Sequence, residues 1–228
     1  MRSILLFTLI ISQFCWAQDS LSTHFPDTNY VEDQFYASLT YGILTNRPSG
    51  ISQNNLSYGI SVGFIKDLPI NKRRNVAFGI GFGYAANGFY HTLRGLQQNG
   101  TIVYEAVPAD VTYKRNKTAT HVLEFPVEFR WRTSTAESYK FWRIYTGMRF
   151  GYVFANTTKF VTDAETFRFT NPDIQKFQYG IHASFGYDTW NFYANYQLSS
   201  LHRKGTETTD GEAVAMRPLQ VGVIFYVL

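Results

Sequence analysis

Alternation between apolar and polar side chains is the strongest pattern in this chain, and it is clearest between Leu123 and Phe154. Two runs, separated by a short polar break, place an apolar residue at nearly every second position. These residues are Leu123, Phe125, Val127, Phe129 and Trp131 in the first run, and Trp142, Ile144, Thr146, Met148, Phe150, Tyr152 and Phe154 in the second. A period of two predicts β-strands with one apolar and one polar face. Each run has room for about ten residues, the length of a strand that crosses a bilayer at a tilt.

The same alternation recurs along the rest of the chain. The strands it predicts lie near 34–44, 56–66, 76–85, 123–131, 142–154, 177–187, 190–199 and 216–228. The connections alternate in length: those at 91–118, 156–173 and 201–215 are long, whereas Asp188 and Thr189 form a two-residue turn. Long loops on one side and short turns on the other are typical of outer-membrane barrels, whose short turns face the periplasm. We therefore predict an all-β fold, an eight-stranded antiparallel up-and-down transmembrane β-barrel.

The direction in which each face points separates a membrane barrel from a soluble one, whose apolar face points inward. Of the 17 glycines, 11 fall on the predicted polar face, at 42, 59, 63, 79, 81, 83, 147, 151, 180, 186 and 222. A crowded barrel interior favours residues without side chains, whereas a solvated surface does not. Trp131, Trp142 and Trp190 fall at the periplasmic ends of their strands, as expected for an aromatic belt at one membrane interface. The outer aromatic zone would contain Tyr41, Tyr58, Tyr84, Tyr179 and Tyr196.

The two ends of the chain carry targeting signals. Arg2, the apolar run 4–11 and the small residue Ala17 indicate a signal peptide at 1–17, followed by a periplasmic leader at 18–33 and the barrel at 34–228. A lipid anchor on Cys15 is the alternative. Cleavage after Ala17 removes the single cysteine, so the mature chain can hold neither a disulfide nor a thiolate metal site. The last strand resembles the C-terminal signal that the barrel assembly machinery recognises, at Gln220, Gly222, Phe225 and Val227.

Charged residues on the predicted polar faces would be enclosed by the barrel. They include Glu124, Glu128, Arg130, Arg143 and Arg149. A turn centred near Ala136 and Glu137 would place Glu124 opposite Arg149, Glu128 opposite Tyr145, Arg130 opposite Arg143 and Trp131 opposite Trp142. Enclosed charges must be paired or solvated, because an unpaired one costs several kcal/mol. We therefore expect an ionic network that fills the polar interior and locks the barrel; a gated charged conduit is the alternative. Pro126 lacks an N–H and predicts a bulge or a break in strand pairing.

Candidate binding and catalytic groups are few. A net charge of +4 is too small to indicate a nucleic-acid partner. Six cations at the predicted outer end are candidate contacts for lipopolysaccharide phosphates: Lys114, Arg115, Lys117, Arg203, Lys204 and Arg217. His182 and Ser184 resemble part of the site of outer-membrane lipid A deacylases, but both would point inward, and we expect His182 to bond to Asn195 on the next strand. We predict no cofactor, no metal and no enzymatic activity.

At Leu123–Trp131, with the cleavage context Ala17-Gln18, the chain resembles the PorT-like outer-membrane β-barrel family of Bacteroidota. The resemblance implies an integral outer-membrane protein without catalytic residues, and its founding member takes part in type IX secretion. We therefore expect an accessory subunit of an envelope complex, with other outer-membrane proteins as partners. The alternatives are a stand-alone barrel that stabilises the membrane or mediates adhesion, and an enzyme that acts on lipid.

Overall fold

The computed structural model describes residues 32–53, 55–98, 100–133 and 141–227. The predicted signal peptide and the leader up to residue 31 lie outside these residues. Within the described ranges, no helix is long and apolar enough to cross a membrane.

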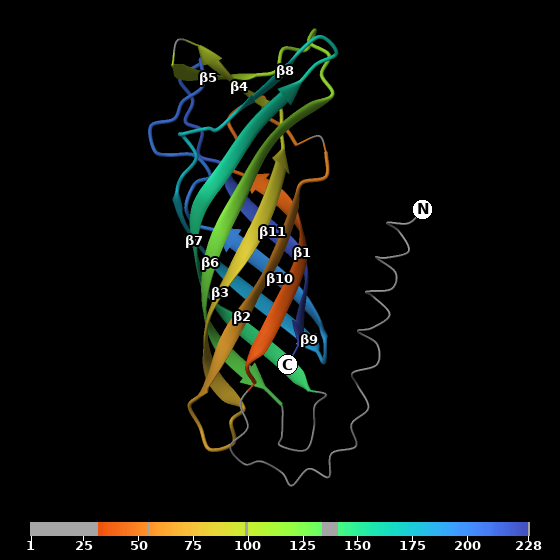
Figure 1. Ribbon diagram of the computed structural model, residues 1–228, viewed down its shortest axis with the longest axis vertical. Helices are drawn as coiled ribbons and strands as arrows, with labels where there is room; N and C mark the ends of the chain where they lie inside the picture. The colour runs from red at the N-terminus through yellow and green to blue at the C-terminus, as the bar shows by residue number, and fades with distance from the viewer. Residues whose placement is uncertain (1–31, 54, 99, 134–140, 228) are drawn as a thin grey trace, which may run out of the picture. The chain divides into compact units, whose positions relative to one another are not determined.

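Eight strands of the described chain close into an antiparallel barrel (Figure 1). They are β1 (Gln34–Thr45), β2 (Tyr58–Pro69), β3 (Val76–Tyr90), β6 (Arg115–Arg132), β7 (Trp142–Val161), β9 (Phe177–Tyr187), β10 (Trp190–Gln197) and β11 (Arg217–Val227). Each pairs with the next around the ring, and β1 pairs with β11 to complete it. Closure leaves the barrel wall without a free edge. The predicted fold class is confirmed.

Three short strands lie outside the barrel wall, where the sequence predicts only loops. β4 (Leu93–Gln98) and β5 (Thr101–Ala106) form a hairpin between β3 and β6, and β8 (Thr166–Phe169) pairs with the end of β7. Figure 1 shows all three at the end of the barrel opposite the C-terminal end of β11. β6 and β7 themselves extend to this end, 18 and 20 residues long. Long connections are present here, but the predicted bounds 91–118 and 156–173 are too wide, because they include β4, β5, β8 and the extensions of β6 and β7. Polar residues on both faces of the strand extensions leave no apolar alternation that predicts them.

The apolar faces of the barrel strands point outward. Phe78, Ile144 and Phe185 are 46%, 43% and 48% exposed, whereas Glu124 and Arg149 are 8% and 6% exposed. This confirms the predicted orientation. The inward glycines make room for neighbouring side chains: a Cβ on Gly63 would lie 2.6 Å from the Tyr36 ring, and one on Gly83 would collide with the Tyr36 hydroxyl. The small residues of β2 and β3 thus accommodate a ring from β1.

The register between β6 and β7 differs from the prediction by two residues. Glu124 faces Gly151, Glu128 faces Gly147, Arg130 faces Tyr145 and Trp131 faces Ile144. The hairpin begins where the Thr133 amide donates to the Trp142 carbonyl at 2.9 Å. The polar residues near this turn give no apolar signal from which its centre can be located. The predicted turn centre at 136–137 lies outside the described residues.

Two local irregularities shape β6. Pairing with β3 is interrupted at Phe125 and Pro126, which confirms the break expected where proline has no amide hydrogen. A second shift lies between His121 and Val122, opposite β7. Such bulges increase local twist and bend a strand, and this one lies where β6 passes from the barrel wall into its extension. The predicted turn at Asp188 and Thr189 is confirmed by the flanking pair Tyr187–Trp190 and by the positive φ of Asp188, 55°.

Candidate functional site

A buried ionic network occupies the barrel interior at the short-turn end, and Arg130 is its centre. Its Nε donates to Glu128 Oε2 at 3.1 Å, its Nη1 to Asp67 Oδ1 at 3.0 Å, and its Nη2 to Gln34 Oε1 at 3.1 Å. The Arg130 side chain is fully buried. Each nitrogen of the guanidinium therefore has a hydrogen-bond acceptor, as a buried cation requires.

Asp67 joins two arginines and was missed by the sequence analysis. Arg132 donates to both of its carboxylate oxygens, from Nη1 at 2.8 Å and from Nη2 at 2.7 Å, while Arg130 contacts the same carboxylate. Asp67 lies on the inward side of β2, one residue beyond the predicted end of that strand at Lys66. Continuing the alternation Ser61, Gly63, Ile65 by one step would have identified it.

Aromatic rings complete the packing around these cations. The Arg130 Cζ lies 4.5 Å from the Tyr145 ring centroid, and the Arg143 Cζ lies 4.5 Å from that of Phe141 and 5.5 Å from that of Tyr226. Among the described residues, rings lie against the Arg143 guanidinium, and the Glu32 carboxylate interacts with it electrostatically. The predicted facing of Arg143 and Arg130 is wrong, because the shifted register places Tyr145 opposite Arg130.

A second ion pair lies nearer the middle of the barrel. Arg149 Nη1 donates to Glu124 Oε2 at 2.9 Å, and the guanidinium lies over the rings of Tyr36 and Tyr193 at 5.6 Å and 5.2 Å. Glu124 and Arg149 are therefore partners, as predicted from the sequence, although their side chains meet diagonally rather than from directly opposite positions. Two cavities of about 30 Å³ and 10 Å³ adjoin this pair. Such volumes hold one or two water molecules.

His182 and Ser184 point into the barrel, as predicted, but do not form a nucleophile–base pair. His182 Nε2 lies 3.3 Å from Glu128 Oε1, so it has an acidic neighbour that the sequence did not reveal. Ser184 Oγ instead lies 3.3 Å from the Tyr226 hydroxyl. Asn195 faces His182 across β9 and β10, but its amide donates to Gln220 Oε1. The expected bond between His182 and Asn195 is therefore wrong.

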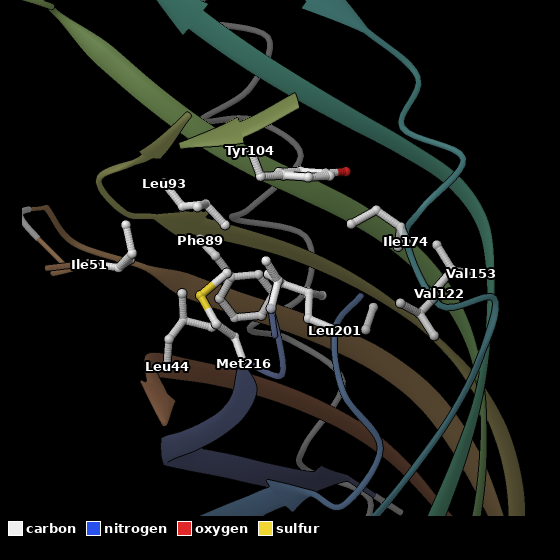
Figure 2. Packing of buried hydrophobic residues seen from close by; sticks show 12 residues of the cluster. Leu44, Ile51, Phe89, Leu93, Tyr104, Val122, Val153, Ile174, Leu201 and Met216 are labelled. Carbon is white, nitrogen blue, oxygen red and sulfur yellow. The ribbon is translucent and has the colours of Figure 1, made fainter. Parts of the chain in front are cut away.

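An apolar cluster, the outer seal, occupies the barrel at the long-loop end. Its members on the barrel strands and at their ends are Leu44, Ala85, Phe89, Val122, Val153 and Met216, and its members from the loops and the β4–β5 hairpin are Ile51, Leu93, Tyr104, Ile174, Leu201 and Val214. Figure 2 shows these side chains converging on the mouth of the barrel. The prediction of a polar interior is therefore wrong at this end. The sequence feature from which this seal could have been predicted is the presence of isolated apolar residues within otherwise polar loops.

Polar contacts join the loops into a cap over this seal. The Tyr104 hydroxyl lies 3.0 Å from Asn171 Oδ1 and from Asp173 Oδ2, and the Ser49 amide donates to Glu212 Oε2 at 2.6 Å. His91 Nε2 lies 3.1 Å from Thr118 Oγ1. Burial lowers the pKa of His91 to about 4 and that of His202 to about 3, so both imidazoles are neutral at pH 7.

A groove of about 630 Å³ opens on the cap between β5 and the loop before β11. Its lining includes Ile102 and Tyr104 on one side and Arg203, Lys204 and Glu207 on the other. The groove is polar, carries both signs of charge and is exposed. It can accept a polar segment of another molecule through charged and hydrogen-bonding groups.

The six cations proposed as lipopolysaccharide contacts do not form one cluster. Lys114 is ion-paired with Asp163, and Lys117 Nζ donates to the Tyr58 hydroxyl at 2.8 Å. Arg203 and Lys204 line the cap groove, and Arg217 lies opposite Thr45 at the start of β11. Arg115 faces Val161 beyond the barrel wall. The predicted residues therefore lie in several separate places.

The predicted periplasmic aromatic belt lies at one end of the barrel. Trp131, Trp142 and Trp190 are exposed, Trp142 stacks on Phe185 at 5.2 Å, and Trp190 contacts Phe225 edge-on at 5.0 Å. Phe225 and Val227 alternate with the buried Ile224 and Tyr226 on β11. Recognition of this strand by assembly machinery stays a prediction.

Comparison with known proteins gives one family and distant structural neighbours. The family model described as outer membrane protein beta-barrel domain matches residues 16–203. A sequence comparison with curated proteins finds no match. The crystal structure of Ail, the attachment invasion locus protein of Yersinia pestis, is similar with a TM-score of 0.41 and 12% identity, over 86% of this chain and 97% of that one. A structure described as "Asymmetric conductivity of engineered proteins" has a TM-score of 0.22 and 11% identity, over 87% and 100%.

Proposed function

Because the chain belongs to the outer membrane protein beta-barrel domain family and is an integral protein of the outer membrane, we propose that it works by binding. In this proposal it is a non-enzymatic, non-conducting barrel that presents its loop cap to another component of the cell envelope. The observation that carries the proposal is that both ends of the barrel interior are occupied, by the Arg130 network and by the outer seal. A barrel whose interior is occupied in this way presents its cap as a surface for recognition.

The construction of the cap supports a preformed binding surface. Segments from four connections meet in it: Tyr104 forms an isolated bridge with Thr208, and Ile174 forms one with His202. The Ser49 amide donates to Glu212, which joins the β1–β2 loop to the loop before β11. A surface held in place before binding loses less conformational entropy when a partner docks.

The arrangement around His182 supports the absence of hydrolytic chemistry. A catalytic serine needs a base within hydrogen-bond reach, whereas Ser184 contacts Tyr226 and His182 contacts Glu128. Both residues also face the packed interior rather than lipid. A lipid-acting enzyme therefore receives no geometric support from these two residues.

The experiment is co-purification from native membranes in mild detergent with two charge-reversal variants. The cap variant is Arg203→Glu with Lys204→Glu; the matched control is Lys72→Glu with Arg73→Glu, in the turn at the opposite end. We expect a stoichiometric partner that the cap variant loses and the control retains. Equal recovery of the partner with both variants would overturn the role of the cap.

Two candidate roles follow for a barrel that works by binding. The resemblance of Leu123–Trp131 to PorT-like barrels supports a component of a secretion complex. The second candidate is a stand-alone barrel that stabilises the membrane or adheres to surfaces, favoured by the strand extensions that carry β8 beyond the wall. Wild-type protein that purifies alone, together with increased permeability of a deletion strain, would select this second candidate.

A further inference from the structure

We propose that the outward face of the β6–β7–β8 extension binds the phosphate groups of an outer-leaflet lipid, with Lys159 and Arg168 as the main contacts and Lys117 beside them. This inference goes beyond the proposed function and does not depend on it. Neither Lys159 nor Arg168 was among the candidate contacts predicted from the sequence.

The three cations form one row across three neighbouring strands, which we call the cation row. Lys117 on β6 faces Lys159 on β7, and Lys159 faces Arg168 on β8. Directly opposite residues of antiparallel strands project from the same face with Cβ atoms about 5 Å apart. The row therefore spans about 10 Å, the separation of β6 from β8.

The row points away from the barrel interior. On β7 the neighbours of Lys159, Thr158 and Phe160, are both buried, so Lys159 lies on the other face. Lys117 lies over the rings of Tyr58 and Tyr90, at 4.8 Å and 5.5 Å from Nζ to the centroids. The cations therefore lie on the outer side of the wall rather than over the barrel mouth.

The charge of the row is not neutralised by the protein. Among the described residues, Lys159 and Arg168 have no ion pair or side-chain hydrogen bond, whereas the nearby Lys114 and Arg94 are paired with Asp163 and Glu105. Like charges directly opposite each other in a sheet are destabilising. A bound anion would remove this repulsion, and arginine beside lysine suits phosphate oxygens in particular.

The position of the row along the strands indicates a lipid headgroup. Four residues toward the barrel wall from Lys117 lies His121, whose Nδ1 is 2.6 Å from the Tyr84 hydroxyl and whose ring contacts Phe154. Aromatic residues of this kind mark the membrane–water interface. At about 3.3 Å per residue, the row lies about one headgroup layer beyond these aromatic side chains, where lipid phosphates are found.

Gly88 fixes the place of Lys117 in this arrangement. A Cβ on Gly88 would lie 2.7 Å from the Lys117 Cε, so the missing side chain lets the lysine stem cross β3 to the Tyr58 hydroxyl. Lys117 thereby leans away from Lys159, which leaves Lys159 and Arg168 as the pair that shares a phosphate.

A soluble polyanion is the competing ligand class. The cap offers such a ligand Arg203 and Lys204, which are exposed above the barrel mouth. The cation row instead faces sideways above the lipid-exposed wall, where a lipid with its chains in the membrane reaches it. The position of the row therefore favours the lipid over a soluble polyanion.

The test compares Lys159→Gln with Arg168→Gln against the control Lys72→Gln with Arg73→Gln, in the turn at the opposite end of the barrel, each with two charges removed. Lipopolysaccharide binding to the purified full chain in mild detergent is measured by native mass spectrometry, and heat-modifiable migration on gels checks that each barrel is folded. We expect binding to weaken about tenfold in the row variant and to remain unchanged in the control. Dephosphorylated lipopolysaccharide should bind wild type as weakly as intact lipopolysaccharide binds the row variant.

Several outcomes would overturn the proposal. One is an equal loss of lipopolysaccharide binding in the row variant and the control, or no loss in the row variant. Another is wild-type protein that binds dephosphorylated lipopolysaccharide, or soluble heparin, as tightly as it binds intact lipopolysaccharide. Competition by inorganic phosphate at the lipid concentration would likewise show a free-anion site rather than a lipid site. If the double variant does not fold, Arg168→Gln alone, at the exposed edge strand β8, serves in its place and should weaken binding by a smaller factor.

Discussion

At the scale of single residues, Asp67 determines how the interior of the barrel is held together. It accepts from Arg132 through both carboxylate oxygens and from Arg130 through one of them. Glu128 compensates Arg130 from the other side. The buried cations thus depend on a carboxylate contributed by a different strand, so side chains join β2 to β6 across the intervening strand β3.

Replacing Asp67 with Asn should strongly destabilise the folded barrel. Arg132 would lose its carboxylate partner in a fully buried position, and removing one member of a buried ion pair typically costs about 3–5 kcal/mol. Urea-induced unfolding in lipid vesicles measures the change in the free energy of unfolding. Asp163→Asn, which removes the exposed partner of Lys114, is the control and should leave the unfolding midpoint within experimental error. Matching midpoints for the two variants would refute the structural role of Asp67.

At the scale of elements, the connections do more than join strands. The β4–β5 hairpin supplies Leu93 and Tyr104 to the outer seal, and the loop before β11 supplies Leu201 and Val214. The same cap contains two buried histidines, with Tyr104 edge-on to the His202 ring at 5.6 Å. Its packing therefore depends on both imidazoles staying neutral.

The cap should loosen as the pH falls. The folded pKa values of about 4 for His91 and about 3 for His202 lie below the unperturbed value of about 6.5. An opened cap then binds protons that the closed cap excludes, so stability present above pH 6.5 is lost as the pH falls toward 4. At pH 5 we expect opening to be favoured on the order of tenfold or more per histidine relative to pH 7.5.

Hydrogen exchange of the loop amides at pH 7.5 and pH 5, corrected for intrinsic rates, measures this effect. Tyr104 lies edge-on to the His202 ring and its hydroxyl donates to Asp173, while proximity to His91 also lowers the pKa of His202. The variant His91→Gln with His202→Gln should remove the acid sensitivity. If acid loosens the cap of this variant as much as that of wild type, the histidines are not responsible.

At the scale of the whole molecule, two separate groups of side chains obstruct the barrel interior, one at each end. The outer seal blocks the long-loop end and the Arg130 network occupies the short-turn end, with the Glu124–Arg149 pair between them. An eight-stranded barrel is just wide enough for its own side chains to fill. Opening one end therefore leaves the other obstruction in place.

Removing the β4–β5 hairpin should not by itself make the barrel conduct. In planar bilayers, a variant with residues 93–106 replaced by a short glycine–serine linker should show no stepwise conductance, because the ionic network is untouched. Combining the deletion with alanine at Asp67, Arg130 and Arg132, and at Glu124 and Arg149 between them, should permit small steps if the barrel remains folded. Sustained conductance of the wild-type chain would contradict the proposed non-conducting role and revive the charged conduit.

The strand pattern, the outward apolar face, the inward glycines and the positions of the three tryptophans at one end of their strands could all be predicted from the amino-acid sequence. Each of these depends on the period of two and on the side of the wall that meets lipid, which are local properties of a strand. The sequence also identified Glu124 and Arg149 as partners, since both lie on inward faces of neighbouring strands. Even with the register wrong by two residues, long side chains could still meet.

The β6–β7 register, the contacts of Asp67, the outer seal and the cation row depend on the three-dimensional fold and could not be predicted from the sequence. Register depends on where a polar turn closes, and apolar periodicity does not mark that point. The seal joins residues as distant as Leu44 and Met216, and the row aligns Lys117, Lys159 and Arg168 through strand pairing outside the barrel wall. These arrangements follow from contacts between segments far apart in the chain, which the alternation within any one segment cannot specify.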